Sequence, residues 1–448
     1  MLMLTFKDCR NPVLPVNYHI PDPEAHVMSD GRVYVYGSLD LHDDMFCSTA
    51  YHVISSHNMV DWVDHGVSFQ SKDVEWIYNE VETAGPVIDF SNLTPFLKKM
   101  IERDTKNGKL EIPKFPKDFL FAPDAIQKNE SYYLYFCTSG NKEGVAIADK
   151  PTGPFHNPIP LPCSGIDPAV FIDKDGQAYY FWGQFYAHAA KLKENMVEFE
   201  ENSIVYNLIT EQQHFFHEGS SIRRRGDLYY FVYSSIVRGK PTSLAYATSH
   251  SPLGPFEYRG VIIDNERCDP SSWNNHGSIE EVNGQWYVFY HRCSRRTKQW
   301  RRLCIEPIYF NEDGTIQEVV MTSQGAGRPF VEDEDIEAYR ACELKGNVYI
   351  APIHAELEGL TGISEGDEAV FRYVEWDSSV NNISVTATGS GLIEIILDDD
   401  DDRSGYVLVA DGVVITSSIS AIAGKHEVKL QFTDVKDLQL ISLRFATY

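Results

Sequence analysis

The chain has 448 residues, of which 43% are hydrophobic and 12% aromatic, a composition typical of a packed globular protein and not of a disordered one. Its length predicts two domains. The formal net charge of −26 would repel nucleic acid and anionic membranes, so neither is expected as a partner, and a neutral or cationic ligand fits better than a polyanion. The 25 Tyr and 24 Phe favour strands over helices.

The eight cysteines stand singly, with no C-x-x-C pair and no nearby pair of histidines, which argues against zinc. Several lie in strand-like runs, where a buried free thiol is the expected state. The N-terminus has no basic stretch leading into an apolar run, and no apolar stretch is long enough to span a bilayer. We therefore expect a reduced, cytoplasmic protein, unless a leader has been trimmed.

One short pattern recurs along the first part of the chain: a Gly or polar turn followed by an aromatic-rich run of alternating residues. Its five copies lie at 31–36, 130–135, 176–181, 226–231 and 284–289. One strand pattern repeated at spacings of roughly forty to sixty residues is typical of four-stranded propeller blades. We predict an all-β protein with a five-bladed β-propeller at residues 1–328, in which loops from every blade surround one central pocket.

Three further segments interrupt or follow this pattern. Residues 72–118 are an insertion with a possible helix near 93–103, expected to be a surface loop or a lid. Residues 329–340 are acidic and are predicted to form a linker. From 341 to 448 the chain changes to short β-branched runs with Gly and Asp turns, which predicts an antiparallel β-sandwich.

Three carboxylates lie just before strands of the repeat. Asp22, in Ile-Pro-Asp-Pro-Glu-Ala-His, and Asp167, in Gly-Ile-Asp-Pro-Ala-Val, both precede a proline, which predicts an extended backbone at the Asp. Glu218, in His-Glu-Gly-Ser-Ser, stands at the start of the fourth blade. A single Asp-Pro pair is most often part of a turn. The shared register of all three acids instead predicts that they converge on the propeller axis.

Converging acids repel one another, which separates their proton affinities. Glycoside hydrolysis uses that separation, because one acid must stay protonated for the leaving group while one carboxylate stays charged to activate water. The residues alone therefore point to a glycosidase site, with a third acid tuning the first.

With these motifs the chain resembles glycoside hydrolase family 43, whose members are five-bladed propellers that invert anomeric configuration. The resemblance covers about residues 11–325 and includes further motifs at 121–125, 233–235, 246–249 and 275–278. It implies that Asp22 is the general base, that Glu218 is the general acid and that Asp167 raises the proton affinity of the acid and orients it. Phe121 departs from the pattern, since relatives often carry Trp there.

The resemblance also implies an exo-acting enzyme that releases a pentose, α-L-arabinofuranose or β-xylose, from plant-type oligosaccharides. A cytoplasmic location would suit short imported oligosaccharides. Which sugar is released stays open, because loops and not motifs distinguish the two rings. Two alternatives also stay open: a retaining fructan-type hydrolase or transferase on the same architecture, and a non-catalytic glycan-binding propeller.

His276 precedes the fifth repeat strand, and the resemblance suggests that it holds a water or a calcium ion in the central channel. A hydrogen-bonded core histidine is the alternative, since calcium prefers oxygen ligands. No cofactor is expected for the chemistry itself. Further candidates for substrate binding are Trp76, Asp124, Trp182, Tyr186 and Arg301. For Asp124, capping a turn is the other reading, and for Trp182 it is core packing.

The C-terminal region resembles a family 6 carbohydrate-binding module at 366–374 and 385–396. Tyr373 and Trp376 are candidates for glycan contact, with core packing the favoured reading. The acidic run at 398–402 could bind calcium, although a solvated turn is the commoner role of such a run. This domain could also simply brace the propeller.

Overall fold

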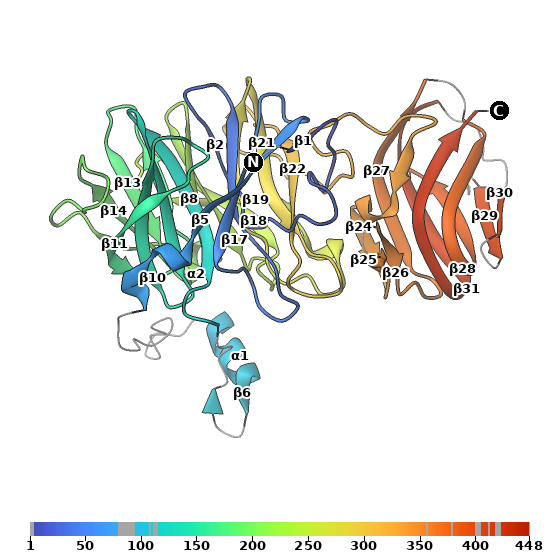
Figure 1. The fold of residues 1–448 in the computed structure, drawn as a ribbon, viewed down its shortest axis with the longest axis horizontal. Helices are drawn as coiled ribbons and strands as arrows, with labels where there is room; N and C mark the ends of the chain where they lie inside the picture. Colours follow the sequence, from blue (N-terminus) through green and yellow to red (C-terminus); the bar gives the residue numbers. More distant parts are fainter. Residues whose placement is uncertain are drawn as a thin grey trace.

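The computed structural model describes residues 4–78, 95–106, 109–110, 115–354, 357–377, 380–398, 405–410, 413–416 and 423–447. Figure 1 shows two bodies of strands, a propeller formed by the first part of the chain and a smaller sandwich formed by the last part. The predicted all-β fold is confirmed. No helix within the described ranges is long and apolar enough to cross a membrane.

The propeller has five antiparallel sheets. Blade 1 contains β2 (Glu24–Val27), β3 (Val33–Ser38), β4 (Ala50–Ser56) and β5 (Trp62–Gln70), with β1 (Leu4–Phe6) added at the outer edge. Blade 2 contains β8 (Leu120–Lys128), β9 (Ser131–Thr138), β10 (Lys142–Ala148) and β11 (His156–Ser164). Blade 3 contains β12 (Ala169–Ile172), β13 (Ala178–Trp182), β14 (Tyr186–Leu192) and β15 (Val205–Thr210).

Blade 4 contains β16 (Phe216–Arg225), β17 (Leu228–Ser235), β18 (Ser243–Ser249) and β19 (Glu257–Asp264), preceded by the short helix α2 (Glu211–His214). Blade 5 has three strands, β20 (Ser278–Val282), β21 (Gln285–Arg292) and β22 (Arg302–Ile308), with the turn η3 (Glu266–Cys268) before them. The first strands of the five blades, β2, β8, β12, β16 and β20, contact one another in a ring and are the innermost strands.

Each copy of the aromatic repeat lies mainly in the second strand of its blade. In every blade this second strand carries a fully buried tyrosine that packs between neighbouring sheets: Tyr36, Tyr135, Tyr180, Tyr230 and, just past the last copy, Tyr290. A buried aromatic side chain removes roughly 150–250 Å² from water, so these residues stabilise the contacts between blades. The repeat therefore marked the blades correctly because sheet packing requires large apolar groups at every second position.

The N-terminal segment closes the ring at the edge of blade 5. Val13 N donates to Leu303 O at 3.0 Å, and the side chain of Asn11 accepts from Ile305 N at 2.9 Å and donates to Ile305 O at 3.0 Å. This segment thus adds to β22 at the place where the other blades carry a fourth strand. Apolar residues of blades 1 and 5 then pack together in one cluster.

The insertion after blade 1 contains the turns η1 (Ser71–Asp73) and η2 (Glu75–Ile77), the helix α1 (Pro95–Asp104), and the short hairpin β6 (Thr105–Lys106) and β7 (Lys109–Leu110). The helix lies close to its predicted position, and Figure 1 shows it standing off the propeller. The Arg103 guanidinium lies 5.2 Å from the ring of Trp273. Residues 79–94 of the insertion fall outside the described ranges.

The C-terminal strands form the predicted sandwich around one apolar core. They are β23 (Asp335–Glu337), β24 (Glu343–Lys345), β25 (Tyr349–His354), β26 (Leu357–Thr361), β27 (Glu368–Trp376), β28 (Asn382–Leu397), β29 (Gly405–Ala410), β30 (Val413–Thr416) and β31 (Gly424–Ala446), with the turn η4 (Ala338–Arg340) after β23. Part of the predicted linker is thus β23, which pairs with β31.

Two long strands join the layers of the sandwich. Among the short β-branched runs of this region, those at 382–387 and 391–397 would be two strands by their pattern, but both belong to the single strand β28, which pairs with β31 along its length. Register shifts near Gly389 let the paired strands bend from one layer into the other. All eight cysteines are free and six are buried, as predicted.

Candidate active site

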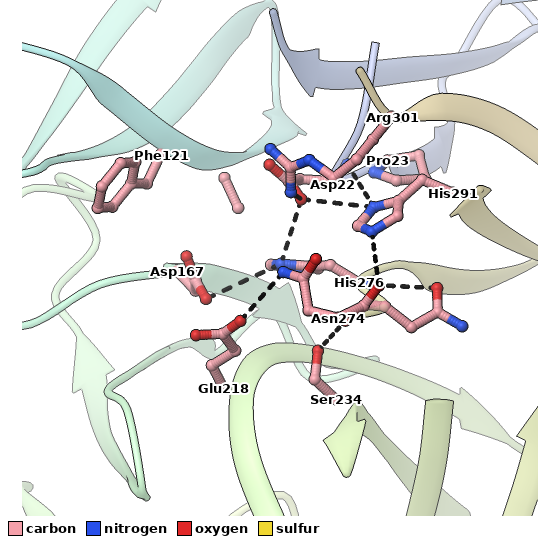
Figure 2. A network of polar contacts seen from close by, with 12 residues as sticks. Asp22, Pro23, Phe121, Asp167, Glu218, Ser234, Asn274, His276, His291 and Arg301 are labelled. Carbon is pink, nitrogen blue, oxygen red and sulfur yellow. Dashed lines mark hydrogen bonds and ion pairs between the residues drawn. The ribbon is translucent and has the colours of Figure 1, made fainter. Parts of the chain in front are cut away.

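The starts of the inner strands bring the three predicted acids to one place. Asp22 and Asp167 each lie two residues before an inner strand, β2 and β12, and Glu218 lies within β16. Figure 2 shows the three carboxyl groups around His276, whose Nδ1 is 3.8 Å from an oxygen of Asp22 and 3.8 Å from an oxygen of Asp167. Residues distant in sequence thus meet on the axis, as the repeat register predicted.

The backbone at both aspartates differs from the prediction. Asp22 and Asp167 each have φ of 56°, in the left-handed region, and not the extended conformation expected before proline. The chain must turn sharply there to enter an inner strand, and Asp tolerates this region better than most residues because its short polar side chain can bond locally. Such a residue costs about 1–2 kcal/mol, and strained positions of this kind cluster at functional sites.

Asp22 is held in its ionised form by Arg301. The Nη1 atom of Arg301 donates to Asp22 Oδ1 at 2.6 Å. Burial is the largest influence on Asp22 and raises its pKa, but the Arg301 guanidinium, together with the smaller contributions of the other groups around the carboxylate, brings the pKa below its ordinary value. His276 and His291 also face Asp22, yet burial lowers the pKa of both rings, that of His291 to about 3, so they are uncharged near neutral pH.

Arg301 is clamped from its other side by Asp40. Its Nε and Nη2 atoms each donate to the Asp40 carboxylate at 2.9 Å, which fixes the guanidinium plane toward Asp22. Only 2% of Arg301 is exposed. The structure thus brings Arg301 to the acids, in electrostatic contact with the carboxylate of Asp22.

Asp167 has the opposite surroundings. Burial raises the pKa of Asp167 well above its ordinary value, and the nearby charges of Glu218 and Asp22 raise it further. Its backbone N–H donates to Cys137 Sγ at 3.2 Å. Asp167 therefore keeps its proton at a pH where Asp22 is already charged.

Glu218 is the most accessible of the three acids, with 13% of its side chain exposed against 4% for Asp22 and 6% for Asp167. Gln184 Nε2 donates to its Oε2 at 2.7 Å, and Asn274 Nδ2 donates to its Oε1 at 3.3 Å. The two amides hold the carboxyl group in place through both of its oxygens.

Sequence reasoning missed Gln184, Asn274 and Asp40. Asn274 directly precedes the 275–278 motif, so its position offered a signal. Gln184 and Asp40 are isolated polar residues after the second strands of their blades, where no spacing marks them.

Asp124 lies further along the channel and does not face the three acids. Its Oδ1 lies 2.7 Å from His26 Nε2, and its Oδ2 accepts from Val170 N at 2.6 Å. These contacts connect blades 1, 2 and 3. In the structure Asp124 thus joins the inner strands of three blades.

The predicted stacking tryptophans lie in apolar cores. Trp182 is 3% exposed and its ring stacks on Tyr180 and Phe199. Trp76 packs on Phe136 and donates its Nε1–H to Pro158 O at 3.1 Å, on the outermost strand of blade 2. Neither ring is brought to the acids. Both pack within the blades, and the sequence alone could not separate this role from sugar stacking, because blade packing also requires large aromatic residues. Tyr186 begins β14.

Comparison with known proteins agrees with this geometry. The chain matches the sequence model of the glycosyl hydrolases family 43 over residues 9–316. It belongs to this family. A xylosidase/arabinosidase of Thermoclostridium stercorarium is 31% identical over 382 residues, which cover 75% of this chain and 72% of that protein. The enzyme is therefore a glycoside hydrolase.

Two further relatives extend the comparison. An arabinoxylan arabinofuranohydrolase of Bacillus subtilis is 25% identical, with 94% of this chain and 89% of that protein covered. A solved β-xylosidase/α-arabinofuranosidase from a compost microbial metagenome, in complex with xylotriose and in a calcium-free form, is 27% identical with a TM-score of 0.54, covering 71% of this chain and 99% of the other.

Proposed function

We propose that this glycoside hydrolase is exo-acting and inverting, and that it releases α-L-arabinofuranose or β-xylose from plant-type oligosaccharides. The observation that carries the proposal is the unequal electrostatics of the three acids. Asp22 is paired with Arg301, whereas Asp167 and Glu218 face each other in a buried setting. The names of the relatives, xylosidase and arabinosidase among them, support the choice of a pentose.

In the proposed reaction the Asp22 carboxylate accepts a proton from water while the oxygen of that water bonds to the anomeric carbon. Glu218 gives its proton to the departing glycosidic oxygen as the bond between carbon and that oxygen breaks. Asp22 and Glu218 lie on either side of His276 in Figure 2, which suits a water that attacks from the face opposite the leaving group. The product then has inverted configuration.

A panel of 4-nitrophenyl glycosides tests this function. We expect hydrolysis of the α-L-arabinofuranoside or the β-D-xylopyranoside, and a loss of about 10²–10⁴-fold in kcat in both Asp22→Asn and Glu218→Gln. Unchanged turnover in Glu218→Gln would show that this site is not the catalytic one. Glycan binding without hydrolysis of any pentoside would favour a non-catalytic propeller.

We propose that the C-terminal unit, from about residue 341, mainly braces the propeller and retains at most a peripheral role as a family 6 type module. Trp376 packs on His426 and Phe445 inside its core, so its ring is not offered to a glycan. Asp398 binds the His426 ring at 2.7 Å and Glu427 N at 2.9 Å, as expected of a turn; residues 399–402 lie outside the described ranges.

To test that role, xylo-oligosaccharides are titrated into the full chain carrying Glu218→Gln, and binding is followed by tryptophan fluorescence. The titration is then repeated with the added substitution Tyr373→Ala, since Tyr373 is the half-buried aromatic candidate of the sandwich. If the sandwich only braces, the second substitution leaves binding unchanged. A lost binding phase in the double variant would assign a glycan site to the sandwich.

A further inference from the structure

A cluster of charged side chains crosses the central channel beyond the three acids. The Nη2 atom of Arg223 donates to Glu24 Oε1 at 2.8 Å, and its Nε donates to Glu280 Oε2 at 2.5 Å. The same guanidinium donates to Ala25 O and lies 3.4 Å from His26 Nε2. Arg223 thus connects blade 4 to blades 1 and 5.

The remaining contacts of the cluster reach the other two blades. Asp124 of blade 2 bonds to His26, and its second oxygen accepts from Val170 N of blade 3. Ser221 Oγ donates to Glu24 Oε1 at 3.0 Å. All five inner strands therefore contribute to one buried polar network around the axis.

Three members of this network also have the arrangement of a metal site. Ligand atoms of Glu24, His26 and Asp124 lie within 4.8 Å of one another. Since one structural relative is described as a calcium-free form, calcium is the ion to consider in this fold. Calcium takes six to eight oxygen ligands at about 2.3–2.6 Å.

The residues present do not fit that ion. Glu24 Oε1 already accepts from Arg223 and from Ser221, and both oxygens of Asp124 are engaged. A divalent ion between these ligands would stand close to the fixed positive charge of Arg223 in a poorly screened interior. Burial lowers the pKa of His26 to about 4, so this ring is neutral near neutral pH. Arg223 is therefore the cation of the described cluster.

We propose that the Arg223 guanidinium takes the place of a channel metal ion, so that the inner strands of this enzyme are joined without calcium at this cluster. Three carboxylates, those of Glu24, Asp124 and Glu280, surround a cation that the chain itself supplies. Unlike a bound ion, this cation cannot dissociate or be removed by a chelator. The proposal concerns the stability of the fold and does not depend on the identity of the sugar.

The test compares the thermal unfolding of the full chain after treatment with EDTA and after addition of excess Ca²⁺. For the wild-type protein we expect the same Tm in both conditions and no stoichiometric metal by elemental analysis. Arg223→Met removes the charge and keeps a long side chain, so this variant should have a lower Tm than the wild type. Its Tm should also rise when Ca²⁺ is added, because three carboxylates then lack a cation.

Arg224→Met is the matched control, since Arg224 pairs with Asp173 in a more exposed contact and should give neither a large loss nor a response to Ca²⁺. A wild-type Tm that falls in EDTA, recovers with Ca²⁺ and loses this recovery in Glu24→Gln would overturn the proposal. A wild-type response that persists in Glu24→Gln would place the ion elsewhere and leave this cluster metal-free. Should Arg223→Met fail to fold, the wild-type metal content and chelator response still decide.

Discussion

At the scale of residues, the site gives similar acids different proton affinities through their neighbours. Asp22 contacts a guanidinium, whereas Asp167 is buried among other carboxyl groups. The surroundings of Asp22 therefore support its proposed role as the base. Arg301 is central to this difference, and Asp40 determines where Arg301 points.

We predict that Asp40→Asn moves the acid limb of the profile of kcat/KM against pH to higher pH. Asp22 must be ionised to accept a proton, so activity falls as pH drops through its pKa. Without the Asp40 carboxylate, Arg301 is held less firmly and lowers the pKa of Asp22 by a smaller amount. A loss of about 1 kcal/mol of attraction between Arg301 and Asp22 would move the acid limb up by about 0.7 pH unit. Asp43→Asn, in the same loop but bonded to Trp300, should leave the limb in place. An unshifted limb in Asp40→Asn would rule out this positioning role.

Asp167→Asn should move the alkaline limb to lower pH. Burial and the nearby charges of Glu218 and Asp22 raise the pKa of Asp167, and an amide at this position removes that carboxyl group and its interaction with Glu218. The measurement is again kcat/KM against pH, with kcat recorded separately. If the alkaline limb stayed in place while kcat alone fell, Asp167 would orient the acid without tuning it.

At the scale of elements, alternating aromatic runs predicted the blades because each strand must bury every second side chain. The same reasoning could not separate stacking from packing, so Trp182 looked available to a sugar although it lies in the core. The bend that joins the layers along β28 was also hidden, since a bulge near Gly389 leaves no hydrophobic signal. The acids Asp22 and Asp167 were found through their register, but their left-handed backbone follows from tertiary constraints.

Ring closure by the N-terminal segment gives a prediction about stability. Asn11→Ala removes the side chain that bonds to both backbone groups of Ile305 and leaves them buried without partners, which should cost about 2–3 kcal/mol. Thermal unfolding should show a clearly lower Tm with an unchanged pH profile of activity. Gln317→Ala, which removes one exposed bond to Asn311, is the control and should change Tm little. A Tm of Asn11→Ala equal to that of the control would mean that other contacts close the ring.

At the scale of the whole molecule, the sandwich reaches the active site through neighbouring arginines. Arg301 faces Asp22, and the next residue, Arg302, faces Glu358 of the sandwich, with Nη1 to Oε2 at 2.9 Å. The other oxygen of Glu358 binds Arg295 at 2.9 Å. The loop that carries Arg301 is therefore held by both domains.

Glu358→Ala should destabilise the protein by about 3–5 kcal/mol, because it leaves Arg302 buried without its partner. It should also lower kcat/KM, since the loop that positions Arg301 loses an anchor. Asp335→Ala breaks an exposed pair with Arg444 and should change stability by less than about 1 kcal/mol. Full activity and an unchanged Tm in Glu358→Ala would separate the sandwich from the site.

The configuration of the first product tests the central claim most directly. Proton NMR during hydrolysis of 4-nitrophenyl β-D-xylopyranoside, or of the α-L-arabinofuranoside if that is the substrate, records the anomer before mutarotation. With Asp22 activating water and Glu218 protonating the leaving group, α-xylose or β-arabinofuranose must form first. First appearance of the retained anomer would contradict the assignment of Asp22 as general base.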